Sequence, residues 1–211
     1  MENTLDKVNA IIEENEKIIA NILHDVKSPL YSIKIALQNR LESELNKDIY
    51  ETTIDTINYI ENFLVNYGFK SGKFETKAAL CDIKKIIEKK IENLKSIFLY
   101  KNIHIDIIEN EQNFIINSSE AILSSIIGNI VSNIAFHASK NSLAVINISR
   151  KSNHICVDFQ NKYDKTNADF SLGLDFCAKL TSVINSNLKF SKTKDSVVVN
   201  LKIFELNKRI G

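Results

Sequence analysis

A seven-residue repeat of apolar side chains runs through the first part of the chain and constrains its structure more than any other feature. Apolar residues at this spacing form a continuous seam along a helix, so the repeat predicts one long helix over residues 3–45. Asn15 and Pro29 interrupt the seam. An asparagine there can fix the register of helix packing, and a proline kinks a helix because it lacks an N–H group. The seam consists of Leu5, Val8, Ile12, Ile19, Ile22, Val26, Ile33 and Ala36.

A second helix is predicted over residues 47–67, again with one stripe of side chains suited to packing. A hairpin of two such helices cannot bury both of its apolar faces alone. The simplest partner is a second copy of the chain, which predicts a homodimer joined by a four-helix bundle. The stripe consists of Ile49, Thr53, Thr56, Ile60, Phe63 and Tyr67.

The pattern changes after Gly68–Gly72, which we interpret as a linker between a helical domain (residues 1–68) and a second domain (residues 73–211). Asp82, and either Ser118 or Ser119, are the predicted N-caps of two helices in that second domain. The order of elements predicts an α/β sandwich with helices on one face of a mixed sheet, so the whole chain is expected to be α+β. Strands are predicted over residues 73–80, 103–108, 114–116, 144–149, 154–160, 188–190 and 196–204, and helices over residues 83–101, 118–138 and 172–184.

Charge and composition narrow the classes of partner. Charged residues make up 25% of the chain and nearly cancel, at a net charge of +1. This balance argues against a nucleic-acid partner or a polybasic membrane surface. No apolar run is long enough to span a bilayer, and the acidic N-terminus lacks the plan of a signal peptide, so we expect a cytoplasmic protein. Cys81, Cys156 and Cys177 lack metal-ligand spacing and are expected to be reduced core residues.

The segment His24-Asp25-Val26-Lys27-Ser28-Pro29-Leu30 is the sharpest chemical signal. Ile22 and Val26 belong to the seam and are expected to face inward, so His24 is expected to point to solvent. An exposed histidine is largely neutral and nucleophilic near neutral pH, which suits it to accept a phosphoryl group. Asp25 can polarise the ring and Lys27 adds positive charge. Ser28 lies one helical turn beyond His24, where its hydroxyl can orient a water.

This segment resembles the phosphoacceptor box of two-component sensor histidine kinases, whose pattern is His, an acid, an apolar residue, Arg or Lys, Thr/Ser/Asn, Pro and Leu. The resemblance covers almost the whole chain. It implies that His24 is the phosphoacceptor and that Asp25 assists transfer. It further implies that Ser28 helps to remove the phosphoryl group from the receiver domain of a partner response regulator.

The second domain resembles the ATP-binding domain of the same family. Residues 126–135 (IIGNIVSNIA) resemble its asparagine box. The resemblance implies that Asn133 helps to hold Mg²⁺ and that Asn129 lies near the phosphates of ATP. Asn161 aligns with the aspartate that reads the adenine amino group. Leu172 and Gly173 open a helix whose N–H groups can meet phosphates.

Several residues of that nucleotide site depart from the family pattern. Phe136 stands where a basic residue is common. Both glycines that normally follow the position of Asn161 are absent, and Asn185-Ser186-Asn187 replaces a glycine pair after the last helix. Without glycine the backbone approaches a ligand less closely, so we expect weakened ATP binding. The chemistry between His24 and a regulator aspartate is untouched by these losses.

Three functions remain open from the sequence. The first is a phosphatase or phosphotransferase acting on a response regulator, with little or no autokinase activity. The second is an ATP-dependent histidine kinase with an unusual pocket, and the third is a non-catalytic module that binds and sequesters a partner. We expect the controlling signal to come from a small ligand, a partner or the second domain.

Overall fold

The computed structural model describes residues 2–38, 40, 43–70, 78–163 and 171–205. The chain divides into two compact units, Met1–Glu75 and Thr76–Gly211, each described here by itself. Within the described residues, no helix is long and apolar enough to cross a membrane.

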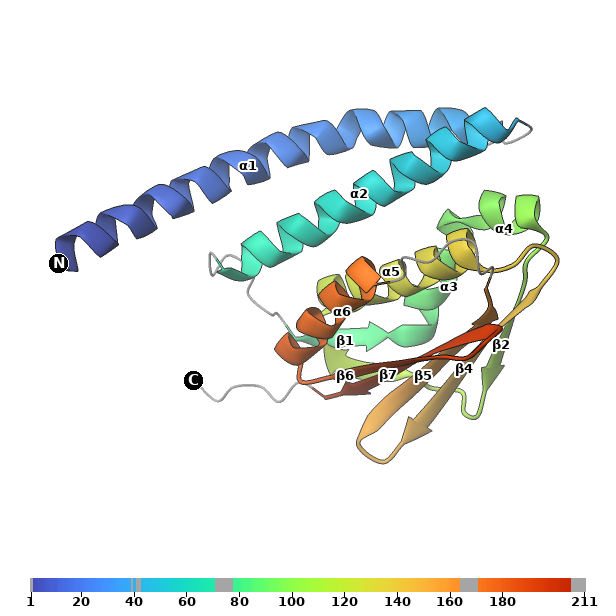
Figure 1. Ribbon diagram of the computed structural model, residues 1–211. Coiled ribbons are helices and arrows are strands. Elements are labelled where there is room, and N and C mark those ends of the chain that lie inside the picture. Colours follow the sequence, from blue (N-terminus) through green and yellow to red (C-terminus); the bar gives the residue numbers. More distant parts are fainter. Residues whose placement is uncertain (1, 39, 41–42, 71–77, 164–170, 206–211) are drawn as a thin grey trace. The chain divides into compact units, whose positions relative to one another are not determined.

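Unit 1 is a hairpin of two helices, α1 (Glu2–Leu37) and α2 (Glu44–Lys70), which lie side by side (Figure 1). Helix α1 is continuous through Pro29 and bends along its length without breaking. It ends eight residues before the predicted boundary of 45, because Ser43 caps the next helix: its Oγ accepts a hydrogen bond from the Asn46 N–H at 3.1 Å. Gly68 belongs to α2 and not to a linker, and residues 71 and 72 lie outside the described part.

The face that α1 turns toward α2 is not the predicted seam. That face carries buried or half-buried residues, namely Ala20, Leu23, Lys27, Leu30, Tyr31 and Lys34. The seam residues Val8, Ile12, Ile19, Ile22, Val26 and Ile33 are instead 41–55% exposed within one chain. The expectation that Ile22 and Val26 face inward is therefore wrong for a single hairpin. The Leu5 side chain lies outside the described part.

Unit 2 is an α/β sandwich built on a five-stranded mixed sheet in the order β2-β4-β5-β7-β6. Strand β2 runs parallel to β4, and all other neighbours are antiparallel. Figure 1 shows α3, α5 and α6 on one side of this sheet. A separate pair, β1 and β3, completes the unit. The strands are β1 (Ala79–Asp82), β2 (His104–Glu109), β3 (Ile115–Ser118), β4 (Leu143–Lys151), β5 (His154–Lys162), β6 (Asn187–Lys192) and β7 (Ser196–Phe204); the helices are α3 (Ile83–Asn93), α4 (Lys95–Lys101), α5 (Glu120–His137) and α6 (Ser171–Val183).

The helix starts follow local capping chemistry. Asp82 caps α3, accepting a hydrogen bond from the Lys85 N–H at 3.2 Å, as the sequence predicts. Ser119 occupies the N-cap position of α5, although its hydroxyl makes no capping bond there. The predicted helix over residues 83–101 is two helices, because the backbone leaves helical geometry at Leu94 (φ −116°, ψ 12°). The strand predicted from residue 73 begins at Ala79 in the described residues.

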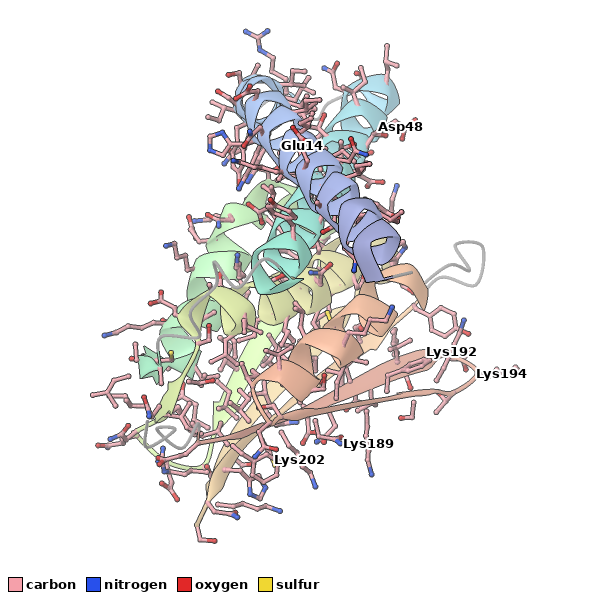
Figure 2. All side chains as sticks on the ribbon, turned by 90° about the vertical axis from the view of Figure 1, so that its left-hand side faces the viewer. Glu14, Asp48, Lys189, Lys192, Lys194 and Lys202 are labelled. Atoms are coloured by element: carbon pink, nitrogen blue, oxygen red, sulfur yellow. The ribbon has the colours of Figure 1, made fainter. Side chains whose placement is uncertain are left out.

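Strand β6 forms one edge of the sheet and carries lysines. Figure 2 shows Lys189 of β6 and Lys202 of β7 projecting on the side of the sheet away from the helices. Lysines along an edge strand disfavour pairing with strands of other molecules. The opposite face of β7 points into the core, where Val197, Val199 and Leu201 are buried.

Candidate functional site

His24 and Asp25 project from α1 into solvent, with side-chain exposures of 79% and 86%. The His24 Nδ1 lies 3.7 Å from the Asp25 Oδ1. This distance is too long for a hydrogen bond but short enough for attraction once the imidazole carries a proton. The ring is therefore accessible to a large partner, and a carboxylate stands beside it to stabilise a positive imidazolium.

Ser28 is also exposed and lies one helical turn beyond His24 on the same helix. Its backbone carbonyl accepts a hydrogen bond from the Ser32 hydroxyl at 3.3 Å. Pro29 has no N–H to give to the Asp25 carbonyl four residues earlier. The His24 ring and the Ser28 hydroxyl thus offer two exposed polar groups within about one turn.

Lys27 is held toward α2. Its Nζ lies 2.7 Å from Oε1 of Glu61, and both side chains are about 30% exposed (29% and 30%). Tyr31 donates a hydrogen bond to the same Glu61 Oε1 at 3.0 Å, and the Lys27 ammonium lies 5.5 Å from the Tyr31 ring centroid. Burial, together with the charge and hydrogen bond of Glu61, raises the pKa of Tyr31 to about 12. Burial lowers the pKa of Lys34, against the opposing attraction of Glu61.

Glu61 and Tyr31 were missed by sequence reasoning. They lie 30 residues apart, and neither belongs to the phosphoacceptor pattern or to the apolar stripes. Only the pairing of α1 with α2 brings their side chains together. The one available signal is a charged residue on the packed face of a helix, which needs a partner of opposite charge.

The two asparagines of α5 differ in their surroundings. Asn129 is buried, and its Nδ2 donates a hydrogen bond to the Ser125 carbonyl of the preceding turn at 2.9 Å. The Nδ2 of Asn133 is also buried, but no atom in the described ranges accepts a hydrogen bond from it. A buried amide without an acceptor costs free energy unless another group supplies one. Asn133 therefore has the more open bonding capacity of the two.

A buried lysine closes the C-terminal end of α5. Lys101, at the end of α4, donates hydrogen bonds from Nζ to the carbonyls of Ala135, at 3.1 Å, and Phe136. A cation there satisfies carbonyls that have no partner inside the helix and interacts favourably with the helix dipole. Burial and the charge of Lys101 lower the pKa of His137. No feature of the sequence pattern indicates that Lys101 reaches this helix end.

Asn161 lies within the sheet, where β5 pairs it with Ala144 on one side and Val197 on the other. It is buried, and its Nδ2 donates a hydrogen bond to the adjacent Lys162 carbonyl at 3.0 Å. Helix α6 begins at Ser171, so Leu172 and Gly173 stand in its first turn as predicted. Their surroundings, and residues 164–170, lie outside the described part.

The remaining candidates for metal or thiol chemistry are the ionisable side chains and the three cysteines. In the described ranges, no three His, Cys, Asp or Glu side chains cluster as metal ligands. The three cysteines are free and buried, as the sequence predicts. Burial raises the pKa of the Cys177 thiol to about 12, which keeps it protonated and unreactive.

Comparison with known proteins places these features in context. No family model matches the chain. The sensor protein KdpD of Clostridium acetobutylicum is 26% identical over 152 residues, which cover 65% of this chain but only 17% of KdpD. Histidine kinase AdeS of Acinetobacter baumannii superposes with a TM-score of 0.62 at 11% identity, covering 87% of this chain and 98% of that one. Histidine kinase ThkA, in complex with response regulator protein TrrA, gives 0.56 at 14% identity and covers 97% of this chain and 65% of that one.

The solved structures share the fold across both units, and unit 2 resembles the catalytic domains of histidine kinases. In sequence, the chain is similar to part of the sensor protein KdpD. The chain is thus similar to the transmitter core of a two-component histidine kinase, as the segment around His24 indicates.

Proposed function

We propose that this protein controls the phosphorylation of a response regulator, acting on the regulator's phospho-aspartate as a phosphatase or phosphotransferase with weak or no autokinase activity. The observation that carries this proposal is the exposed cluster of His24, Asp25 and Ser28 on α1. Within the helical hairpin, a receiver domain can reach these groups without displacing a packed side chain.

Phosphotransfer follows from this arrangement. A ring nitrogen of His24 attacks the phosphorus of the phospho-aspartate in line with the carboxylate oxygen, which leaves as the new nitrogen–phosphorus bond forms. Asp25 stabilises the positive charge that develops on the imidazole ring. Reversal of the same step returns the phosphoryl group to the regulator.

Dephosphorylation uses water in place of the ring. The Ser28 hydroxyl can donate to or accept from a water, so it orients that water toward the phosphorus. The water proton passes to the leaving carboxylate, and inorganic phosphate is released. His24 is not consumed in this reaction, so the two activities are separable by mutation.

The nucleotide side supports the weak-kinase part of the proposal. The Asn129 amide is bonded to its own helix, and Asn161 is buried in the sheet with its Nδ2 bonded to Lys162. Phe136 is buried where a basic residue would meet a phosphate. Transfer from ATP depends on neutralising phosphate charge, and the apolar side chain of Phe136 supplies no positive charge.

An ATP-dependent autokinase is the second candidate, and Asn133 favours it. Its buried Nδ2 has no acceptor in the described residues, which suits a group that meets a ligand. Mg²⁺ takes oxygen ligands and is commonly held by few protein groups, with waters and substrate phosphates completing its shell. The Asn133 Oδ1 fits that limited role, and ATP with Mg²⁺ would supply the phosphoryl group.

The exposed seam of α1 supports a homodimer. Six apolar side chains at heptad spacing are 41–55% exposed in one chain, and the same seam on a second copy would cover them. We propose that two hairpins pair through this seam into a four-helix bundle. His24 lies outside the seam and stays accessible in such a dimer.

The proposed reaction is tested with a receiver domain phosphorylated by acetyl phosphate. Purified protein is added, and the loss of phospho-aspartate and the gain of phosphohistidine are followed over time. The proposal expects faster loss with the wild-type protein, and phosphohistidine that is absent in His24→Ala. Equal rates with wild type, His24→Ala and Ser28→Ala would contradict it and favour a non-catalytic module that sequesters the regulator.

A further inference from the structure

The ion pair between Lys27 and Glu61 determines where the Lys27 ammonium lies on the helix that carries His24. The Lys27 Nζ lies 2.7 Å from the Glu61 Oε1, and the Tyr31 hydroxyl donates to that same oxygen at 3.0 Å. One carboxylate of α2 therefore holds two side chains of α1 within two turns of His24. The pair is partly shielded from solvent, at 29% and 30% exposure.

The Lys27 ammonium can pair with either of two anionic groups, the Glu61 carboxylate or a phosphoryl group on His24. Lys27 lies three residues beyond His24, and side chains at this spacing are neighbours on a helix surface. A lysine side chain is flexible and ends in a compact charge, so it can reach either α2 or a dianionic group on the ring of His24. The side chain is bound to Glu61 when His24 carries no phosphoryl group.

We propose that Glu61 is a positioning residue that holds the Lys27 ammonium away from phosphorylated His24. This inference rests on the proposed function, because it requires that His24 accepts a phosphoryl group. An ammonium bound to the phosphoryl oxygens would favour their dianionic form and retain the group on the ring. With Lys27 held by Glu61, the phosphoryl group stays exposed to the regulator's aspartate and to water.

Because Tyr31 and Lys27 both bind Glu61, variants of Glu61 and Tyr31 can separate the ion pair from the hydrogen bond. Glu61→Gln keeps a carbonyl oxygen that can accept the Tyr31 hydrogen bond, but it removes the negative charge that holds Lys27. Tyr31→Phe does the reverse, since it removes the hydrogen bond and leaves the ion pair. The two variants disturb the same contact between α1 and α2, so they separate the effect of charge from that of packing.

The test uses the 211-residue chain phosphorylated on His24 with phosphoramidate, which needs no ATP. A ring nitrogen forms a bond to phosphorus as the phosphorus–nitrogen bond of the reagent breaks and ammonia leaves. The phosphohistidine resonance is then followed by ³¹P NMR while pH is varied, which gives the second pKa of the phosphoryl group. A nearby cation lowers that pKa because it favours the dianion.

We expect Glu61→Gln to lower the phosphoryl pKa by about half a pH unit, the size that a partly exposed ion pair supports. Tyr31→Phe should give the same phosphoryl pKa as the wild type. In a protein that already carries Lys27→Met, the further change Glu61→Gln should leave that pKa unchanged. The same titration in wild type and Glu61→Gln, or a lowered pKa that persists without Lys27, overturns the inference and leaves the proposed function standing. Failure of phosphoramidate to label His24, judged against His24→Ala, overturns both.

Discussion

The Nδ1 of His24 lies 3.7 Å from the Oδ1 of Asp25, and neither side chain touches the packed interior of its hairpin. The reactive histidine is thus presented on a rigid helix while its neighbouring carboxylate remains solvated. Such an exposed pair contributes little to stability, and its accessibility supports the proposed role of both residues in chemistry with a partner. Substitutions here should change reaction rates with small effects on folding.

Ser28→Ala should reduce dephosphorylation of the regulator by about tenfold or more, because the variant loses the hydroxyl that orients water. Phosphotransfer to His24 should stay near the wild-type rate. The rates are measured separately from inorganic phosphate release and phosphohistidine formation. Ser32→Ala is the matched control, since it removes another exposed hydroxyl one turn further along α1. Wild-type phosphate release by Ser28→Ala would remove Ser28 from the mechanism.

Ile12→Asp with Ile19→Asp should convert the proposed dimer to monomers. Each isoleucine is nearly half exposed in one chain, and burying such a side chain is worth about 1.5–3 kcal/mol. Two charges per copy in an apolar seam should raise the dissociation constant by about a hundredfold or more. Light scattering at micromolar concentration measures the mass. The control, Asn9→Asp with Asn21→Asp, adds the same charge at exposed polar positions and should remain dimeric; a wild-type protein that is already monomeric would refute the bundle.

Lys101→Met should destabilise unit 2 by about 2–4 kcal/mol. The variant leaves the carbonyls of Ala135 and Phe136 without the donor that they share in the wild type. Urea unfolding followed by circular dichroism reports the free energy of unfolding. Lys95→Met is the control, because Lys95 of α4 forms an exposed ion pair with Glu92 of α3, and its loss should change the free energy of unfolding by about 0.5 kcal/mol or less. Similar losses for both variants would argue against the capping role.

His137 should make stability depend on pH. Burial, and then the charge of Lys101, lower its pKa in the folded protein below the ordinary value of 6.5. The unfolded chain then binds more protons below that value, so the free energy of unfolding should fall as the pH drops from 7 through 6.5. His137→Gln should flatten this dependence. His154, whose pKa is also lowered, remains in the variant and accounts for residual slope; an unchanged slope would contradict the assignment.

Much of the fold follows from local sequence patterns, and the exceptions have physical causes. Every predicted strand and helix of the second domain has a counterpart among the described elements. The boundary between α3 and α4 at Leu94 could not be predicted, because no glycine or proline marks it in the sequence. The apolar repeat of α1 was recognised, but not which face meets α2, because that face includes Lys27, Tyr31 and Lys34. Their apolar stems pack while their polar ends find partners, a combination that apolar periodicity does not register.

Some features of the candidate site were also predictable from the sequence, and others were not. His24 is exposed, as expected, but the reasoning behind that expectation was wrong, because Ile22 and Val26 are exposed as well in a single hairpin. The partners of Lys27 and the burial of Asn129 were not predictable, because each depends on contacts set by the surrounding fold. Helical spacing placed Asn129 and Asn133 on one face but did not show that Ser125 takes up the Asn129 amide.

Incubation of the purified protein with radiolabelled ATP and Mg²⁺, and separately with a receiver domain carrying phospho-aspartate, tests the central claim most directly. The account predicts little or no acid-labile label on the protein from ATP, together with loss of phosphate from the receiver that depends on His24 or Ser28. Strong acid-labile labelling in the wild type but not in His24→Ala would contradict the weak-kinase assignment and establish an ATP-dependent autokinase. No effect on the receiver by any variant or by the wild type would contradict the account as a whole.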